Sequence, residues 1–374
     1  MTGRPDTWWL TKQYRIDRDY AAFGQAALEI VEGLTLTAGG RLYKFDNSLI
    51  GFFGYGAGNP LGTPGESLCF GPPTTEGAPC TNLGNIDASG KITPKQSKGN
   101  GFIHKLNLSW QASSDLLFYG TWSRGFRPGG INRRGTLPPF AADFLTNYEI
   151  GFKGSFADRR VRLNAAVFQE EWKAVQLAFL GQNGLTEIQN AGNARIRGAE
   201  AELTVQPTPG LTLTAAGTYT DAYLTTNYCR ISNSPDCSLP GPGGRANFIR
   251  APIGQALPVT PDFKGSLIGR YEFITGAYDL SLQGALSHVG SRWAQLRTDQ
   301  RDALGKLPAY TTVDFTVGAK RGSFTAELFM KNAFDSRGSV TRYAQCSIVG
   351  CAPIGTYDVV VQPRTFGVRF GQRF

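Results

Sequence analysis

The last eleven residues of the chain, 364–374, alternate between two kinds of side chain. The apolar row consists of Phe366, Val368, Phe370 and Phe374. Positions 367, 369, 371 and 373 carry glycine or arginine instead. A ring at the very end of a chain gains little in water, because chain ends fray. One row toward hydrocarbon and one toward a wet lumen is the alternation typical of an outer-membrane strand.

Period-two alternation recurs through most of the chain. Aliphatic and aromatic residues occupy every second position, with few exceptions, in residues 34–42, 148–156, 263–273, 278–286 and 313–317. The 3.6-residue period of an amphipathic helix is scarcely visible. We therefore predict an all-β fold, an antiparallel transmembrane β-barrel of the outer-membrane type.

Composition agrees with a barrel and argues against two other classes. The 374 residues are 41% hydrophobic and 18% charged, and no window approaches the ~18 consecutive apolar residues of a membrane helix. Barrel strands hide half of their residues from lipid and produce no such window. The net charge of +9 comes from 38 Lys and Arg without a basic block. We expect contact with outer-membrane lipid and no binding of nucleic acid.

Turn signals divide the chain into about thirteen strands joined by alternately short and long connections. The longest connections are 51–99, 225–260 and 338–359. In outer-membrane barrels the short turns are periplasmic and the long loops extracellular. The expected strands lie near residues 19–30, 34–50, 100–111, 116–128, 144–157, 161–178, 185–206, 211–224, 261–274, 278–293, 309–321, 324–337 and 360–374.

An odd number of strands is unexpected, because bacterial single-chain barrels close with an even number. An open sheet in lipid would leave two edges unpaired, at several kcal/mol for each polar group. Either residues 7–17 supply a fourteenth strand, or the chain is the C-terminal part of a larger barrel. Charges occupy both rows of residues 15–19, which favours the larger barrel.

The expected organisation follows from that choice. Residues 1–18 are predicted to be an N-terminal remnant or partial strand, and residues 19–374 the C-terminal part of the barrel. Residues 1–10 lack the basic region, apolar core and cleavage site of a signal peptide. We therefore expect the front of the protein to be missing from this chain.

Six cysteines fall in three close pairs within segments rich in Gly, Pro, Ser and Asn. The spacing Cys-x2-Cys is absent and the chain has only two histidines, so a metal site is not expected. Three local disulfides would each stabilise the fold by roughly 2–3 kcal/mol and favour an oxidising compartment. Six unrelated free thiols are the alternative. The predicted pairs are Cys69 with Cys80, Cys229 with Cys237, and Cys346 with Cys351.

Five motifs, in family order, resemble TonB-dependent outer-membrane receptors. They are Tyr-Gly-Thr-Trp-Ser-Arg-Gly-Phe-Arg-Pro-Gly-Gly at 119–130, Asn-Tyr-Glu-Ile-Gly-Phe-Lys-Gly at 147–154, Arg-Gly-Ala-Glu-Ala-Glu at 197–202 with the turn at 207–213, Lys-Asn-Ala-Phe-Asp at 331–335, and residues 363–374. In that family a plug domain fills a 22-stranded barrel. The resemblance implies that about 13–14 of an expected 22 strands are present here and that the plug domain is absent.

The resemblance also implies a function at the bacterial outer membrane. A receptor of this family takes up a scarce small molecule, such as an iron-siderophore, cobalamin or a carbohydrate, with energy from the TonB complex. The expected protein is not an enzyme and needs no cofactor. The TonB complex would act through the missing N-terminal region, and the barrel-assembly machinery would read Phe370 and Phe374 as an assembly signal.

Substrate contacts in such a receptor are expected from outer loops and the upper lumen. The candidates for binding an anionic ligand are Arg124, Arg127, Asn132, Arg133 and Arg134. The alternative, which we favour, is that they line the wall or form ion pairs in the lumen. Glu200 and Glu202, two residues apart on one face, are interpreted as wall residues balanced by Arg195 and Arg197 instead of a glycosidase pair.

Two other functions remain open. A self-standing passive pore of about 14 strands would need residues 7–17 as a strand with one lipid-facing row. A soluble β-sandwich or propeller would show repeats of even length, and no such period is present.

Overall fold

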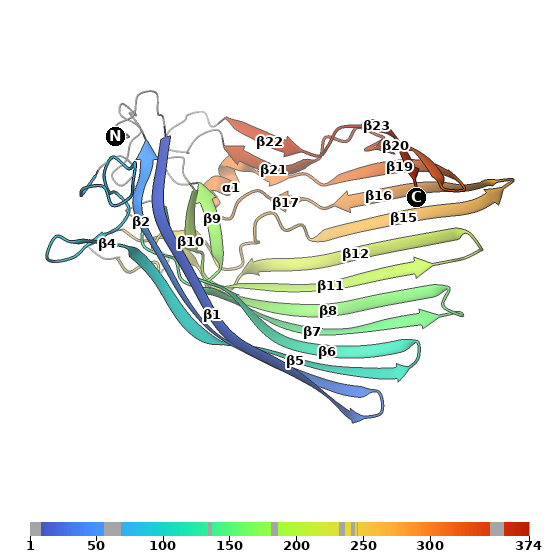
Figure 1. Ribbon diagram of the computed structural model, residues 1–374, viewed down its shortest axis with the longest axis horizontal. Helices are drawn as coiled ribbons and strands as arrows, with labels where there is room; N and C mark the ends of the chain where they lie inside the picture. The colour runs from blue at the N-terminus through green and yellow to red at the C-terminus, as the bar shows by residue number, and fades with distance from the viewer. Residues whose placement is uncertain are drawn as a thin grey trace.

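The computed structural model describes residues 9–55, 69–133, 137–180, 186–231, 236–240, 244, 246–344 and 355–373. Thirteen strands form one antiparallel sheet (Figure 1). Each of them pairs with the next of the thirteen in chain order. In order they are β1 (Trp9–Val31), β2 (Leu34–Tyr55), β5 (Lys95–Ser113), β6 (Leu116–Arg127), β7 (Asp143–Phe156), β8 (Val161–Lys173), β11 (Ala194–Val205), β12 (Leu211–Leu224), β15 (Phe263–Thr275), β16 (Tyr278–Val289), β19 (Tyr310–Arg321), β20 (Phe324–Lys331) and β23 (Thr365–Gln372). The predicted all-β antiparallel fold is confirmed.

The remaining elements are short and belong to the long connections. These lie at one end of the sheet, the loop end, whereas tight turns occupy the other, the turn end (Figure 1). Among the described residues, no helix is long and apolar enough to cross a membrane. The short elements are β3 (Asn85–Ile86), β4 (Ile92–Thr93), β9 (Gln176–Leu180), β10 (Thr186–Asn190), β13 (Tyr228–Cys229), β14 (Ile249–Ala251), β17 (Arg292–Trp293), α1 (Thr298–Leu304), β18 (Lys306–Leu307), β21 (Ser339–Ala344) and β22 (Thr356–Val360).

Several predicted strand boundaries are wrong: the first strand, for example, begins at Trp9 and not near residue 19. Three of the differences have a local backbone reason. Residues 161–178 divide into β8 and β9 at Ala174, whose φ is 54°. Residues 185–206 divide into β10 and β11 at Gly192, whose φ is 86°. Strand β20 ends at Lys331 because Asn332 has a φ of 47°. Positive φ leaves the extended region that a strand requires.

Tight turns at the turn end depend on glycine at two crowded positions. Gly33 has a φ of 76°, and a Cβ there would lie 2.7 Å from the carbonyl oxygen of Gln111. Gly210 has a φ of 81°, and a Cβ would lie 2.2 Å from the carbonyl oxygen of Glu272. Any other residue would meet both strain and collision in these turns.

Side chains of the large sheet alternate between an outer and an inner face, as predicted. The outer face is apolar and uncovered: Ile150, Leu267 and Phe366 keep 69%, 51% and 67% of their surface exposed. An apolar face of this extent is costly in water and stable against hydrocarbon. Cross-strand register aligns it over many strands, for example through Leu203, Ala215, Leu267, Leu286 and Val313.

The inner face is polar, and one predicted charge balance on it is wrong. Glu200 and Glu202 lie on the inner row, opposite Ala166 and Asn164 of β8. Arg195 and Arg197 are an odd number of residues away, so a strand directs them to the other face. There Arg195 forms an ion pair with Glu171 at 2.7 Å, and the Nε of Arg197 donates to Gln169 at 2.8 Å.

The two edge strands of the sheet are β1 and β23. In the described part of the chain, each of them is hydrogen-bonded to a neighbouring strand along one edge only. Residues 9–17 are the first part of β1 and pair with the end of β2, so they do not form a separate fourteenth strand.

Candidate ligand-binding site

The long connections at the loop end pack together into what we call the loop assembly: the described residues of 128–142, 174–193, 225–262 and 290–309. The larger of the two buried apolar clusters in the described structure lies between this assembly and the adjoining ends of β11 and β12. Its members are Val175, Phe179, Ala191, Ala194, Ala222, Leu224, Tyr228, Ala251, Leu257 and Leu296.

Asp143 is the centre of a hydrogen-bond network, the Asp143 network, where β7 begins. It is 1% exposed and accepts hydrogen bonds from Arg127 Nε at 3.0 Å, Trp172 Nε1 at 2.9 Å and the amide of Gln176 at 3.1 Å. A second nitrogen of Arg127, Nη2, also binds Asp143 and donates to the carbonyl oxygen of Gln176 at 2.9 Å. Arg127 therefore fastens β9 to the sheet.

Asn132 also holds loops together. It is 5% exposed, and its Nδ2 donates to the carbonyl oxygens of Pro138 and Ile188, each at 3.0 Å. Its Oδ1 accepts the amide of Ile188 at 2.9 Å. These contacts join the β6–β7 connection to β10 and use both Nδ2 hydrogens of Asn132.

Of the other three ligand candidates, the structure describes Arg124 and Arg133. The guanidinium of Arg124 lies 4.5 Å from the ring centre of Phe144. Arg124 belongs to the same side-chain row of β6 as Trp122. Arg133 is exposed. Arg134 lies outside the described residues.

A second group of contacts, which the sequence did not reveal, surrounds Tyr228. This residue is fully buried, stacks on Phe179 with ring centres 5.4 Å apart, and donates its hydroxyl hydrogen to Gln189. Arg297 is 5% exposed and lies over Phe179, 4.1 Å from the ring centre. Its Nη2 donates to the Tyr228 hydroxyl at 3.2 Å. Three connections therefore meet at one tyrosine.

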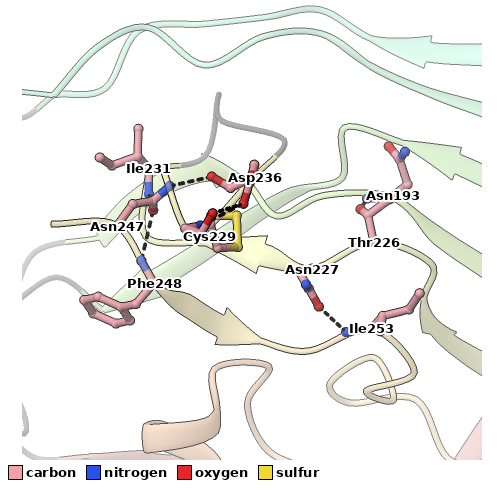
Figure 2. The surroundings of a disulfide bond; sticks show 11 residues. Asn193, Thr226, Asn227, Cys229, Ile231, Asp236, Asn247, Phe248 and Ile253 are labelled. Atoms are coloured by element: carbon pink, nitrogen blue, oxygen red, sulfur yellow. Dashed lines mark hydrogen bonds between the residues drawn. A yellow bond between two sulfur atoms is a disulfide. The ribbon is translucent and has the colours of Figure 1, made fainter. Parts of the chain in front are cut away.

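A disulfide closes the loop that follows Tyr228. Cys229 is bonded to Cys237, and Figure 2 shows Asn247 bridging the two sides of the loop that this disulfide closes. The Oδ1 of Asn247 accepts the amide of Ile231 at 3.0 Å, and its Nδ2 donates to the carbonyl oxygen of Asp236 at 3.2 Å. This segment is thus covalently closed and held against β14.

The structure accounts for part of the remaining predicted residues. Cys69 and Cys80 form a disulfide, whereas Cys346 and Cys351 lie outside the described residues. Phe370 is 79% exposed on the outer row of β23, and Phe374 lies outside the described residues. Within the described residues no group of three or more His, Cys, Asp or Glu side chains is placed to hold a metal ion.

The β21–β22 hairpin is tied to helix α1 through Arg342. Its Nη2 pairs with Asp358 at 2.9 Å, and its Nη1 donates to the carbonyl oxygen of Leu304 at 2.8 Å. The hydrogen bonds from Arg342, together with one from Ser339, lower the pKa of Asp358 from 3.8 to about 2. The ionised carboxylate is therefore the form that the folded hairpin favours.

This hairpin is expected to be acid-sensitive. A carboxyl whose folded pKa is depressed stabilises the fold above its unfolded pKa, and that stabilisation is lost as pH falls through the folded value. We expect hydrogen-exchange protection of the β21 and β22 amides to fall between about pH 4 and pH 2. In Asp358→Asn, protection should already be reduced at pH 7 and should not change over that interval. An unaltered acid response in the variant would contradict the assignment.

Comparison with known proteins places this architecture. The family described as TonB dependent receptor-like, beta-barrel matches residues 5–333. The metal-pseudopaline receptor CntO of Pseudomonas aeruginosa is 29% identical over 248 residues, which are 66% of this chain and 31% of that receptor.

Two solved structures have the same fold. The ferric yersiniabactin uptake receptor FyuA of Yersinia pestis superposes with a TM-score of 0.66 at 19% identity, over 97% of this chain and 46% of its own. The siderophore receptor PiuA of Acinetobacter baumannii gives 0.65 at 15% identity, over 96% and 43%. The chain thus spans less than half the length of each of these relatives. With the family match extending over most of its sheet, the chain belongs to the TonB-dependent receptors and forms part of their β-barrel.

Proposed function

We propose that the protein is an outer-membrane receptor for the uptake of a scarce metal chelate, such as an iron-siderophore, driven through the TonB complex. The observation that carries the proposal is the thirteen-stranded sheet with an uncovered apolar outer face, in a chain of the TonB-dependent receptor family. The names of its relatives, which include siderophore and metal receptors, support the substrate class. Transport of this kind requires no catalysis.

The thirteen strands are proposed to be part of a larger barrel. Strands β1 and β23 each have one unpaired edge in the described structure. An unpaired edge in hydrocarbon costs several kcal/mol for each backbone group, so further strands are needed to close the barrel. We infer that the complete receptor has 22 strands and that the loop end faces the outside of the cell.

The experiment that tests this function is metal uptake in cells that lack or carry the receptor. Radiolabelled iron would be supplied in spent medium from an iron-starved culture, in strains with and without a working TonB complex. We expect accumulation that requires both the receptor and TonB. Iron accumulation in the strain that lacks the receptor serves as the control for uptake by other transporters.

Accumulation that needs the receptor but not TonB would instead favour a passive pore. Uptake that is the same with and without the receptor would contradict both functions.

A further inference from the structure

Positive charges gather on the outer face of the sheet at the loop end, just beyond the apolar row. The outer row there includes more cations than carboxylates, whereas at the turn end Arg321 is its single charged residue in the described strands. The excess of positive charge on this face therefore lies at the loop end. The cations include Arg18, Lys44, Lys98, Lys173, Arg195 and Arg197, and the carboxylates are Asp46, Glu171 and Asp221.

The length of the apolar row places the nearest cations at the membrane surface. On β2 the row runs from Leu34 to Leu42, nine residues. A strand needs about 9–11 residues to cross the hydrocarbon. Lys44 is the next residue of the same row, and its neighbour on β1 is Tyr20. Because tyrosine is enriched where hydrocarbon meets the headgroups, Lys44 lies at the depth of the lipid headgroups.

Three of the cations lie close together on β1, β2 and β5, neighbouring strands at one edge of the sheet (Figure 1). We call Arg18, Lys44 and Lys98 the basic rim cluster. Asp46 of β2 is opposite Arg18 on one side and opposite Lys98 on the other, and Lys44 precedes Asp46 by two residues. All three cations are exposed. Water and lipid headgroups can therefore reach the whole cluster.

One carboxylate does not balance the three cations. Asp46 pairs with Lys98 at 3.2 Å, and the Lys98 side chain is 54% exposed. Arg18 and Lys44 form no ion pair with any carboxylate in the described part of the chain. The cluster therefore carries more positive charge than it neutralises itself. At the surface of a membrane such charges attract anionic headgroups within about a Debye length.

Apolar side chains adjoin the cluster on the side of the turn end. Leu42 and Phe102 lie opposite each other on β2 and β5 and are 60% and 53% exposed. Tyr20, beside Lys44, is 61% exposed. A molecule that covers both the cations and these side chains needs an anionic headgroup and a hydrocarbon chain. A lipid has both, whereas a soluble anion has only the first.

We propose that the basic rim cluster binds the phosphate groups of lipids in the membrane leaflet on the loop side, with their acyl chains along Leu42 and Phe102. The guanidinium of Arg18 presents a planar fork of donors that matches phosphate oxygens, whereas Lys44 and Lys98 act as point charges. Because the cations come from three strands, a lipid with phosphates at separate positions of its headgroup engages several of them at once. The site lies outside the barrel and does not depend on the identity of the transported substrate.

The test measures lipid binding by native mass spectrometry of the complete receptor, purified from outer membranes and delipidated in a neutral detergent. The probes are lipid A, which carries phosphates at both ends of its sugar headgroup, and the same lipid after enzymatic removal of the phosphates. We expect lipid A to bind the unaltered receptor. Its binding should be about 10- to 100-fold weaker in the glutamine variant, which combines Arg18→Gln, Lys44→Gln and Lys98→Gln. The dephosphorylated lipid should bind both proteins weakly.

The matched control removes the same number of positive charges from the inner row. It combines Lys105→Gln, Lys153→Gln and Arg162→Gln. These three residues are also exposed, and each adjoins a residue of the outer row, so the strand directs it to the inner face. Lipid A should bind this control and the unaltered receptor equally well.

A charge-retaining variant separates loss of charge from loss of fold. It combines Arg18→Lys, Lys44→Arg and Lys98→Arg, changes the same three side chains and keeps their charge. Lipid A binding should be preserved in it to within a few-fold, because the phosphates still meet three cations. Heat-modifiable migration checks the fold of every variant before its lipid binding is compared.

Three results would overturn the proposal. The first is equal binding of lipid A by the glutamine variant and the unaltered receptor, and the second is equal binding of lipid A and its dephosphorylated form by the unaltered receptor. The third is a loss of binding in the inner-row control as large as in the glutamine variant, which would mean that total charge attracts the lipid. The same spectra report a second copy of the chain: a lipid-free dimer that disappears in the glutamine variant would assign the cluster to that contact instead.

Discussion

Replacing Asp143 by alanine is expected to reduce the stability of the loop assembly by about 1–3 kcal/mol, because it leaves the indole of Trp172 and the amide of Gln176 without their acceptor, whereas Arg127, 52% exposed, remains solvated. Arg127, the indole of Trp172 and the amide of Gln176 all bind this one carboxylate, which is 1% exposed. None of these donors has another carboxylate partner in the described structure. Strand β9 would therefore lose one of its attachments to the sheet while the strands in the membrane remain paired.

Hydrogen exchange of the amides of Val175 and Gln176 measures this loss directly, since local opening exposes them without global unfolding. We expect exchange to accelerate by about 10- to 100-fold in Asp143→Ala and by less in Asp143→Asn, which keeps one acceptor oxygen. The control is Asp17→Ala, which removes an ion pair with Arg15 whose side chains are 47% and 52% exposed. That pair should contribute about 0–1 kcal/mol. Equal amide exchange rates in Asp143→Ala and the unaltered receptor would show that the Asp143 network does not hold β9.

Most of the large sheet was predictable because the residues that define it are neighbours in sequence. The alternation in 263–273 and 278–286 requires only that successive side chains point to opposite faces, which every strand obeys. The strands β15 (Phe263–Thr275) and β16 (Tyr278–Val289) then pair through a turn at Gly276, whose φ is 57°. The structure has strands with such apolar rows at nearly every position where the sequence predicted a strand.

The loop assembly was not predictable, because its contacts join residues far apart in the chain. Arg297 and Tyr228 are separated by 69 residues, and Arg297 and Gln189 by 108. Alternation says nothing about such partners. Arg127 and Asn132 illustrate the problem: their residue types suit an anionic or polar ligand, but Asp143 and Ile188 bind them instead. These contacts are those expected of wall residues and ion-pair partners, the role of the two residues toward a ligand stays a prediction, and no local signal distinguished them from residues with free donors.

The two parts of the molecule therefore have different sources of stability. The sheet depends on lipid for its outer face, since Leu267 and Ile150 contact nothing that covers them. The loop assembly buries its own apolar cluster around Tyr228 and Leu296 and is closed by a disulfide. Substitutions in the two regions should consequently respond to different conditions. Loop substitutions should depend on reducing agents and denaturant, and sheet substitutions on the surrounding bilayer.

The dependence of the sheet on lipid gives the second large effect, and one strand offers a matched pair of positions. Leu282 of β16 lies on the outer row, 45% exposed, between Tyr271 and Val317 of the neighbouring strands. Ser281, the preceding residue, faces inward, opposite Glu272. An arginine at Leu282 would lie near the middle of the apolar row and should cost about 2–4 kcal/mol. An arginine at Ser281 would enter an inner cavity of about 530 Å³, which is lined by the ion pairs of Arg270 with Glu272 and of Lys320 with Asp279.

Leu282→Arg and Ser281→Arg introduce the same side chain one residue apart, so they differ in which face of the sheet receives the charge. The measurement is the denaturant midpoint of the receptor refolded in lipid vesicles, with heat-modifiable migration as a check on barrel closure. We expect a large loss for Leu282→Arg and a change within about 1 kcal/mol for Ser281→Arg, where the charge stays on the polar inner face. Similar losses for both would mean that the outer row does not face lipid. A loss confined to Ser281→Arg would mean that the two faces of the sheet have been assigned the wrong way round, because period two allows only those two orientations.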